Sequence, residues 1–247
     1  MQKPLDILRN RTAGTMAFRS AAERACGDLM RQVRKRMSEK RINPDNVIVV
    51  IILRAATAFL SAATRAFPDA PVGVLGLKRD ERTLKPRWYY ENLPAISKKN
   101  TVILLDPMLA TGGSAKAAAE RLRERGANPK NMHFVGVVAA PAGVARLAEL
   151  IPRENILVAA VDKGLDERGM IVPGIGDFGD RYFGYPDSPL PDLEHEAWLK
   201  AEKERRAKRE RWRTSRLKRA SRKPKATEEE WTGRARWSRA KNHNEHE

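Results

Sequence analysis

An acid and a small, glycine-rich turn stand between an apolar run and a helical pattern. The segment from Asp106 to Ser114 reads DPMLATGGS, and a helical pattern follows it as far as Arg125. The first turn of a helix carries unpaired N–H groups and a partial positive charge, so small residues there let an anion approach the backbone. The segment therefore predicts a phosphate site, and the simpler alternative is a loop in which Ser114 only caps the helix.

Basic residues follow two of the other apolar runs. Arg54 comes directly after VIVVIIL, and Lys78-Arg-Asp-Glu-Arg82 comes after VGVLGL. In an open α/β sheet, ligands bind outside the carboxyl ends of the strands, so these cations and the Asp106 segment are expected at one crevice. Guanidinium groups stay charged and match phosphate oxygens in pairs. We therefore expect a ligand that carries more than one phosphate.

The elements that position these residues follow from the period of the apolar residues. Five short runs are apolar except for Thr101, which is typical of strands buried on both faces: residues 47–53, 72–77, 101–105, 134–138 and 156–161. Helical patterns occupy residues 18–37, 57–67, 114–125 and 142–150. This alternation predicts an α/β fold with a doubly wound, mostly parallel sheet and helices on both of its faces.

Composition excludes several classes of protein. Cys26 is the single cysteine in 247 residues, so an intramolecular disulfide is excluded, and four scattered histidines add no zinc-site spacing. No run approaches the roughly 20 apolar residues of a membrane helix. No P-loop sequence occurs, and the G-x-G-x-x-G string at residues 174–179 is not expected to open a helix. We expect a soluble, cytoplasmic protein without membrane contact, with Cys26 in its core.

Several motifs in the same order resemble one family. The run DPMLATGGS resembles the phosphoribosyl diphosphate signature of the uracil phosphoribosyltransferases, which have the type I phosphoribosyltransferase fold. The similarity continues through the segments 52–55, 76–86, 138–143 and 171–177, and it covers most of residues 5–184. Because the segments keep the family's order, the combination is much more specific than any one of them.

The resemblance implies a function and its substrates. The family transfers ribose 5-phosphate from phosphoribosyl diphosphate to N1 of uracil, giving UMP and diphosphate. Mg²⁺ binds to the phosphorylated substrate, and we assign no side chain as a metal ligand. It also implies a homodimer. By the same resemblance, the N–H groups of residues 110–114 hold the 5-phosphate, Asp106 binds the ribose hydroxyls, and Arg54 and Arg79 hold the diphosphate.

The resemblance also implies the full set of site residues. Asp177 and Arg79 are the predicted catalytic residues. The predicted phosphoribosyl diphosphate site consists of Arg54, Arg79, Asp106, Pro107, Met108, Leu109, Ala110, Thr111, Gly112, Gly113, Ser114 and Asp177. The predicted uracil site consists of Ile171, Gly176, Asp177 and Phe178.

Three residues depart from the family's pattern. Ala56 replaces a glycine, and its methyl group would obstruct a positive φ or a close approach of diphosphate. Met170 replaces a tyrosine. Phe178 replaces a small residue, so its ring either crowds the uracil pocket or points away. Residues 37–47 are also shorter than the family's path, which carries a β-hairpin arm there. The aromatic residues 88–90 suit part of a lid or a dimer contact, and packed side chains are the simpler interpretation.

The charge of the chain suggests a second domain and an alternative function. The chain carries a net charge of +17, and residues 200–225 hold 14 Lys and Arg against three Asp and Glu. We predict a phosphoribosyltransferase domain over residues 1–186 and a basic extension, helical or disordered, over residues 187–247. The extension suits RNA or another polyanion. The alternative to a salvage enzyme is therefore a weak or inactive phosphoribosyltransferase-fold protein that acts as an RNA-binding or structural component.

Overall fold

The computed structural model describes residues 1–79 and 86–185. The chain divides into two units, residues 1–187 and 188–247, and the second unit lies outside the described residues, as does the predicted polyanion contact at residues 200–225. The helices are α1 (Gln2–Arg9), α2 (Thr15–Glu39), α3 (Thr57–Ala66), α4 (Gly113–Glu124), α5 (Pro141–Ala148) and α6 (Phe178–Phe183), with 3-10 turns η1 (Pro44–Asn46), η2 (Pro129–Asn131) and η3 (Arg153–Asn155). The strands are β1 (Val47–Leu53), β2 (Val72–Arg79), β3 (Pro86–Asn92), β4 (Thr101–Leu105), β5 (Met108–Leu109), β6 (Met132–Ala139), β7 (Ile156–Val161), β8 (Gly164–Leu165) and β9 (Ile171–Val172).

Seven of these strands form one sheet. Its order is β3-β2-β1-β4-β6, with β7 on the other side of β6 and β5 beside β6 beyond the end of β4. All pairs are parallel except β2 with β3. Strands β8 and β9 form a separate antiparallel hairpin. The predicted doubly wound, mostly parallel α/β fold is confirmed.

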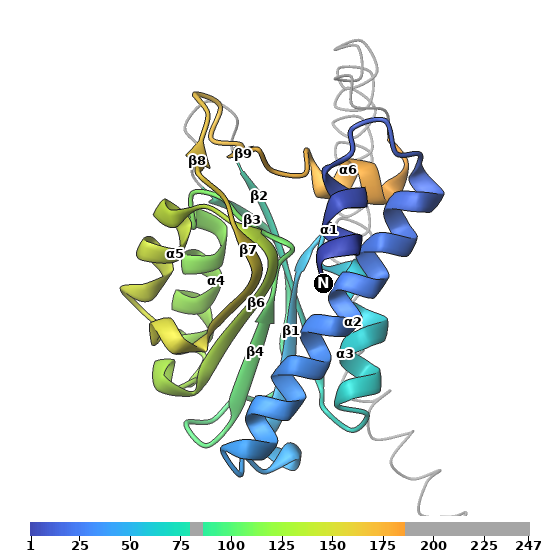
Figure 1. Ribbon diagram of the computed structural model, residues 1–247. Helices are drawn as coiled ribbons and strands as arrows, with labels where there is room; N and C mark the ends of the chain where they lie inside the picture. The colour runs from blue at the N-terminus through green and yellow to red at the C-terminus, as the bar shows by residue number, and fades with distance from the viewer. Residues whose placement is uncertain (80–85, 186–247) are drawn as a thin grey trace, which may run out of the picture. The chain divides into compact units, whose positions relative to one another are not determined.

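Helices cover both faces of the sheet (Figure 1). Helices α1, α2, α3 and α6 lie on one side of it, and α4 and α5 lie on the other. Alternate residues of β1 divide between two apolar cores: Val49 and Ile51 pack with α2 and α3, whereas Val50 and Ile52 pack with α4. The period of two along a strand explains this division, and it explains why the strands are apolar at every position.

Helix α2 shows how the apolar pattern becomes packing. Its residues Ala22, Cys26, Leu29 and Val33 recur at helical spacing, and all are buried against the sheet. The Cys26 thiol is fully buried, and this burial raises its pKa. Cys26 is therefore a core residue, as predicted.

Several elements depart from the sequence prediction. Strand β3 was not predicted, and the side chains of Trp88, Tyr89 and Tyr90 on it are about half exposed, so interpreting them as packed residues was wrong. The residues after Gly176 open helix α6, where no helix was expected. The G-x-G-x-x-G string still lacks a dinucleotide-binding context, because Pro173 and the two-residue strand β9 precede it.

Candidate active site

A cleft opens at the carboxyl ends of β4 and β6, beside the β8–β9 hairpin. Its volume is about 750 Å³, including the space open to solvent. Its lining comes from three segments: Asp106, Met108–Ala115, and Gly169–Ile171 with Asp177. The structure thus brings together most of the predicted phosphoribosyl diphosphate residues and part of the predicted uracil site, which the sequence separates by more than 50 residues.

The glycine-rich turn leads directly into α4. Gly112 has a φ of +75° and is the residue before the first helical turn. The N-cap residue is Gly112, which has no side chain, so the simpler alternative with Ser114 as the cap does not hold. The Thr111 Oγ1 atom accepts a hydrogen bond from the Gly113 N–H at 3.4 Å. The first N–H groups of α4 therefore lie along the cleft with the positive end of the helix dipole behind them. This is an arrangement that binds phosphate.

The chain reaches this turn by following β6 after β4 has ended. The Asp106 N–H donates to the Val135 carbonyl at 3.2 Å, and the Val137 N–H donates to the Pro107 carbonyl at 2.8 Å. The Ala140 N–H then donates to the Leu109 carbonyl at 2.9 Å. These backbone hydrogen bonds fix the Asp106 segment to the sheet, so the position of the turn is set by the core.

Gly143 of α5 lies directly behind the turn. A Cβ atom on Gly143 would meet the Ala110 carbonyl oxygen at 2.5 Å and the Leu109 carbonyl oxygen at 2.6 Å. A Cβ atom on Gly112 would in turn meet the Gly143 carbonyl oxygen at 2.8 Å. The turn therefore requires the absence of a side chain at Gly143, a role that sequence reasoning did not assign. The only signal was its place at the end of the matching segment 138–143.

Two carboxyl groups face the cleft. Burial raises the pKa of Asp106 to about 7, the Met108 N–H at 3.4 Å opposes this rise, and the negative charge of Asp177 adds to it. Asp177 is exposed, and its Oδ1 atom accepts a hydrogen bond from the Asp180 N–H at 2.8 Å, so it caps α6. A site with an acid that is half ionised near neutral pH is a common feature of catalytic centres.

The predicted uracil residues divide into two groups. Ile171 and Asp177 line the cleft, as does Met170, whereas Gly176 and Phe178 do not. Phe178 is fully buried, with its ring 5.3 Å from the Phe18 ring, so its side chain points away from the cleft and does not crowd it.

Arg54, which is expected to hold the diphosphate, lies outside the cleft lining. Arg54 Nη2 donates to Asp180 Oδ1 at 3.1 Å, and the Arg54 side chain is 55% exposed. Arg79 ends β2, but its side chain lies outside what the structure describes. Ala56 is fully buried with a φ of −71°, so neither a positive φ nor a methyl group facing the ligand arises there, and the predicted obstruction was wrong.

A partly buried ion pair connects α1 to the end of β7, and a further hydrogen bond connects it to the loop after β9. Arg9 donates to both carboxylate oxygens of Asp162, at 2.9 and 2.5 Å, and the Asp162 side chain is only 4% exposed. The other hydrogen bond to Asp162 comes from the Gly174 N–H at 2.8 Å. Burial alone would raise the pKa of Asp162, but the hydrogen bonds and charge of Arg9 and Gly174 outweigh it and lower the pKa. The pair fixes the backbone that leads to Asp177.

We expect Arg9→Met to lower the free energy of unfolding by about 3 kcal/mol at pH 7, because it leaves the Asp162 carboxylate buried without its cation. Since the pKa of Asp162 is lowered in the folded protein, the pair stabilises above the ordinary aspartate pKa. Its contribution is lost as the pH falls through the lowered value. Urea denaturation measures the effect. Lys35→Met, which removes an exposed pair with Glu39, is the control and should change nothing measurable. Equal stability of the two variants would contradict a structural role for Arg9.

Residues 1–79 and 86–185 contain no group of three or more His, Cys, Asp and Glu side chains arranged to hold a metal ion. None of the helices in these ranges combines the length and the apolar character that crossing a membrane requires.

Comparison with known proteins agrees with this geometry. Residues 2–185 match the family model for uracil phosphoribosyltransferase. The uracil phosphoribosyltransferase of Limosilactobacillus fermentum is 37% identical over 198 residues, covering 74% of this chain and 94% of that protein. The enzyme of Levilactobacillus brevis is 39% identical with the same coverage. The structure of the AQ2163 protein from Aquifex aeolicus superposes with a TM-score of 0.65 at 30% identity, over 74% of this chain and 93% of that one. The chain therefore belongs to the uracil phosphoribosyltransferase family.

Proposed function

We propose that the cleft transfers ribose 5-phosphate from phosphoribosyl diphosphate to N1 of uracil. The bond from the anomeric carbon to diphosphate breaks and the N1 proton is released, which yields UMP and diphosphate. The observation that carries this proposal is the glycine-lined start of α4 beside the partly buried Asp106 in one cleft. An anion and a group rich in hydroxyls would lie side by side there, as the 5-phosphate and the ribose do in the substrate.

The chain's own groups divide the binding of the sugar phosphate between them. Backbone N–H groups from Ala110 to Ser114 hold the 5-phosphate, and the Asp106 carboxylate accepts hydrogen bonds from the ribose hydroxyls. In the transition state the bond from the anomeric carbon to the diphosphate lengthens and positive charge develops on that carbon. The carboxylates of Asp106 and Asp177 stabilise this charge, and Asp177 acts as the principal catalytic residue.

The leaving diphosphate needs positive charge. Arg54 supplies it by exchanging its partner Asp180 for the diphosphate, and Arg79 of β2 supplies a second guanidinium. Mg²⁺ fits this site as an ion that the substrate itself binds, because diphosphate and ribose oxygens are the hard ligands that it prefers. The two carboxylates of the cleft add negative charge nearby. When bound, it neutralises charge on the departing diphosphate.

The β8–β9 hairpin and the loop after it select the base. Backbone groups of Ile171, Gly176, Asp177 and Phe178 pair with the carbonyls and N3–H of uracil. Cytosine would leave some of these groups without partners, which is costly in a closed site. Phe178 contributes only its backbone, because its ring belongs to the core. This removes one structural reason for considering the chain an inactive relative, and the buried Ala56 removes another.

Incubation of the purified full-length protein with radiolabelled uracil, phosphoribosyl diphosphate and Mg²⁺ tests the proposed function. We expect UMP and diphosphate in equal amounts, and no product when cytosine replaces uracil. Calorimetry with phosphoribosyl diphosphate and Mg²⁺ measures binding separately from turnover. Absence of both product and binding would overturn the proposal.

Gly143→Ala is expected to raise the KM for phosphoribosyl diphosphate by on the order of 10- to 100-fold, because the added methyl group meets two carbonyl oxygens of the phosphate turn and displaces it. Steady-state kinetics below the melting temperature of the variant measures this effect. Gly27→Ala is the matched control, since a Cβ atom there meets only the Arg31 side chain at 3.5 Å. An unchanged KM in Gly143→Ala would show that the turn does not need the close approach.

We also propose an organisation of the whole chain. Residues 1–186 form the catalytic domain, and residues 187–247 form a basic extension that contacts RNA or another polyanion through residues 200–225. The protein acts as a cytoplasmic homodimer, and support for a dimer comes from the exposed aromatic side chains on β3, an edge strand of the sheet. Sedimentation of the full chain, with and without the substitution Trp88→Ser, tests the dimer.

A further inference from the structure

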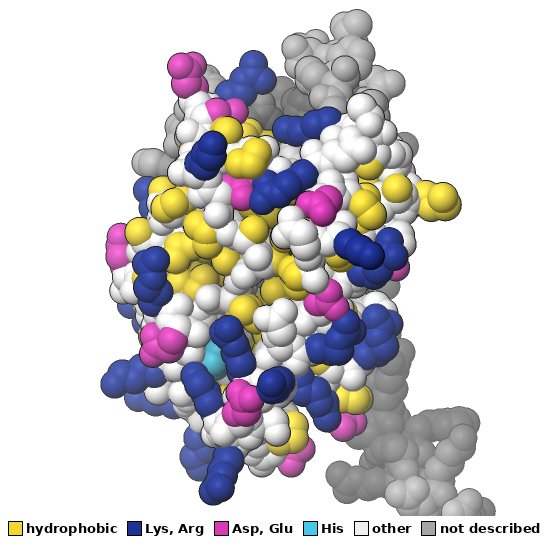
Figure 2. All heavy atoms as spheres, viewed as in Figure 1, with side chains coloured by type: hydrophobic (Ala, Val, Ile, Leu, Met, Phe, Trp, Pro, Cys, Tyr) yellow, Lys and Arg dark blue, Asp and Glu magenta, His cyan; other side chains and the backbone are white. Residues whose placement is uncertain are grey.

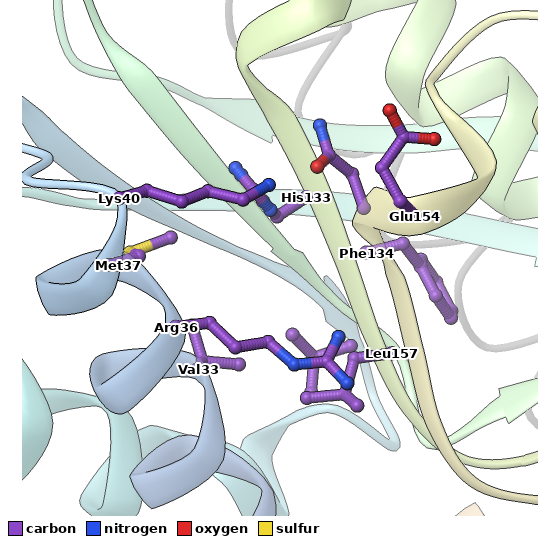
Figure 3. A pocket seen from close by; sticks show the side chains of 10 residues that line it. Val33, Arg36, Met37, Lys40, His133, Phe134, Glu154 and Leu157 are labelled. Carbon is purple, nitrogen blue, oxygen red and sulfur yellow. The ribbon is translucent and has the colours of Figure 1, made fainter.

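The small cavity beside the end of α2, the start of β6 and the turn η3 is not a ligand site. Figure 3 shows Arg36, Lys40 and His133 at this cavity, and in Figure 2 a histidine, in cyan, lies among dark-blue Lys and Arg side chains at this end of the molecule. The cavity has room for about one water molecule. A base or a sugar phosphate does not fit there, and the cleft is the larger of the two.

The loop between β9 and Asp177 is fixed by hydrogen bonds on its backbone. Figure 1 shows this segment running from the β8–β9 hairpin to α6. The Gly174 N–H donates to Asp162, and the Ile175 carbonyl accepts from Arg181 Nη1 at 2.7 Å. The Ile175 side chain is buried in the core that α2 shares with the sheet. The loop therefore has a defined course before any substrate binds.

Arg181 of α6 is a buried guanidinium that binds three backbone carbonyls. The residue is only 6% exposed. In addition to Ile175, it donates from Nη1 to the Leu8 carbonyl at 2.6 Å and from Nη2 to the Asn10 carbonyl at 2.7 Å. Its Cζ atom lies 4.2 Å from the centre of the Phe18 ring. The first two carbonyls are at the C-terminal end of α1, where a cation is favoured. Arg181 thus attaches the loop to the end of α1.

The hydrogen bond from Arg181 sets the direction of the next N–H group. The peptide from Ile175 to Gly176 is trans, so its carbonyl and its N–H point in opposite directions. Since the Ile175 carbonyl faces the buried guanidinium, the Gly176 N–H faces away from it. Gly176 is buried, and within residues 1–79 and 86–185 its N–H has no acceptor. Buried N–H groups without an acceptor are rare, and the next residue, Asp177, lines the cleft. The Gly176 N–H is therefore suited to a ligand in the cleft.

We propose that Arg181 is a positioning residue for the base: by holding the Ile175 carbonyl, it turns the Gly176 N–H toward the cleft, where this N–H donates to a carbonyl oxygen of uracil. The inference rests on the proposed function, which assigns the backbone of Gly176 to uracil. Arg181 acts only through the loop, because it is buried and does not line the cleft. A donor that is already oriented binds without the cost of ordering the loop. Loss of Arg181 should therefore weaken the binding of the base and spare the binding of the sugar phosphate.

Nuclear magnetic resonance of one labelled peptide in the full-length protein tests the direction of this N–H. An isoleucine is followed by a glycine only once in the chain, at residues 175–176. Labelling the carbonyl carbon of isoleucine and the nitrogen of glycine therefore gives a single signal for this peptide. We expect UMP to shift the signal saturably. Ribose 5-phosphate, which has the sugar and the phosphate but no base, should leave it unchanged. No shift with UMP, or an equal shift with ribose 5-phosphate, would overturn the inference.

Arg181→Lys and Arg181→Gln test the part of the guanidinium. Lysine keeps the charge and glutamine keeps an N–H donor, but neither has the planar fork that binds three carbonyls. We expect the KM for uracil to rise about 10-fold and the KM for phosphoribosyl diphosphate to stay unchanged. The UMP-induced shift of the labelled peptide should also decrease. Arg19→Met is the matched control and should change neither KM, because it removes another guanidinium hydrogen bond to α6, from Arg19 Nε to the Tyr182 carbonyl at 2.6 Å.

The two KM values separate positioning from a purely structural role. A variant that only loses folded protein lowers the apparent kcat and leaves both KM values unchanged. An unchanged KM for uracil in the Arg181 variants, or an equal rise of both KM values, would overturn the role of Arg181. If the original protein formed no UMP but UMP still shifted the labelled signal, the proposed function would fail. The size of the UMP-induced shift in the Arg181 variants would then decide the inference without turnover.

Discussion

Asp177→Asn should lower kcat/KM by on the order of 100-fold while leaving the protein folded. Asparagine caps a helix as well as aspartate does, so the hydrogen bond to the Asp180 N–H and the start of α6 should survive. The variant removes the negative charge that faces the cleft and almost nothing else. The loss should therefore appear in the rate of UMP formation and not in the melting temperature.

One further substitution at this position and a control elsewhere test the charge apart from the cap. Asp177→Ser keeps a capping oxygen without the charge, so its activity should fall about as far as that of the Asn variant. Asp45→Asn is the control and should keep full activity, because Asp45 lies in the turn η1 and does not line the cleft. If Asp177→Asn retained full kcat/KM, the carboxylate would be only a helix cap and its catalytic role would be wrong.

The strands buried on both faces were the easiest elements to predict. Residues 47–53 and 101–105 form β1 and β4 with the predicted bounds, because every position in them except Thr101 contacts one apolar core or the other. Strand β3 reads PRWYYEN and lies at an edge with half-exposed side chains, so it has no apolar period. Strands β8 and β9 have two residues each, too few for any periodicity.

The same distinction applies to the site. The turn that lines the cleft before α4 could be predicted because its acid, its glycines and its helix are contiguous from Asp106 to Ser114. The pair of Arg9 and Asp162 could not, since 153 positions separate the two residues and only the fold brings them together. The direction of the Phe178 ring depends on its packing against Phe18, and the need for glycine at 143 depends on how closely α5 approaches the turn. Neither is a local property of the sequence.

Asp106→Asn should make the protein more stable and less active at the same time. The pKa of Asp106 is about 7 in the folded protein, well above the ordinary aspartate value of 3.8. At pH 8 the folded protein therefore contains an ionised Asp106 carboxylate that its surroundings disfavour. A neutral amide of the same shape removes this unfavourable contribution. We expect the free energy of unfolding at pH 8 to rise by roughly 2 to 4 kcal/mol. The kcat/KM should fall on the order of 100-fold, because the amide cannot accept from both ribose hydroxyls or stabilise positive charge.

The pH dependence of this gain has a definite sign. A carboxyl group with a raised pKa contributes most to stability below its unfolded pKa, and this contribution declines as the pH rises toward the folded pKa near 7. The advantage of Asp106→Asn should therefore grow from about pH 4 to pH 7 and stay constant above that. Urea denaturation of both proteins at pH 5 and pH 8 measures it, and the two differences should themselves differ by roughly 2 kcal/mol.

Asp69→Asn serves as the control, because Asp69 lies on an exposed turn and should give the same small difference at both pH values. A gain in Asp106→Asn that was equal at pH 5 and pH 8 would mean that Asp106 is ionised throughout this range. The cleft would then already stabilise the charge before any substrate arrives. In that case the loss of activity would have to come from the lost ribose contacts alone, and the affinity for phosphoribosyl diphosphate would show no proton uptake or release at Asp106.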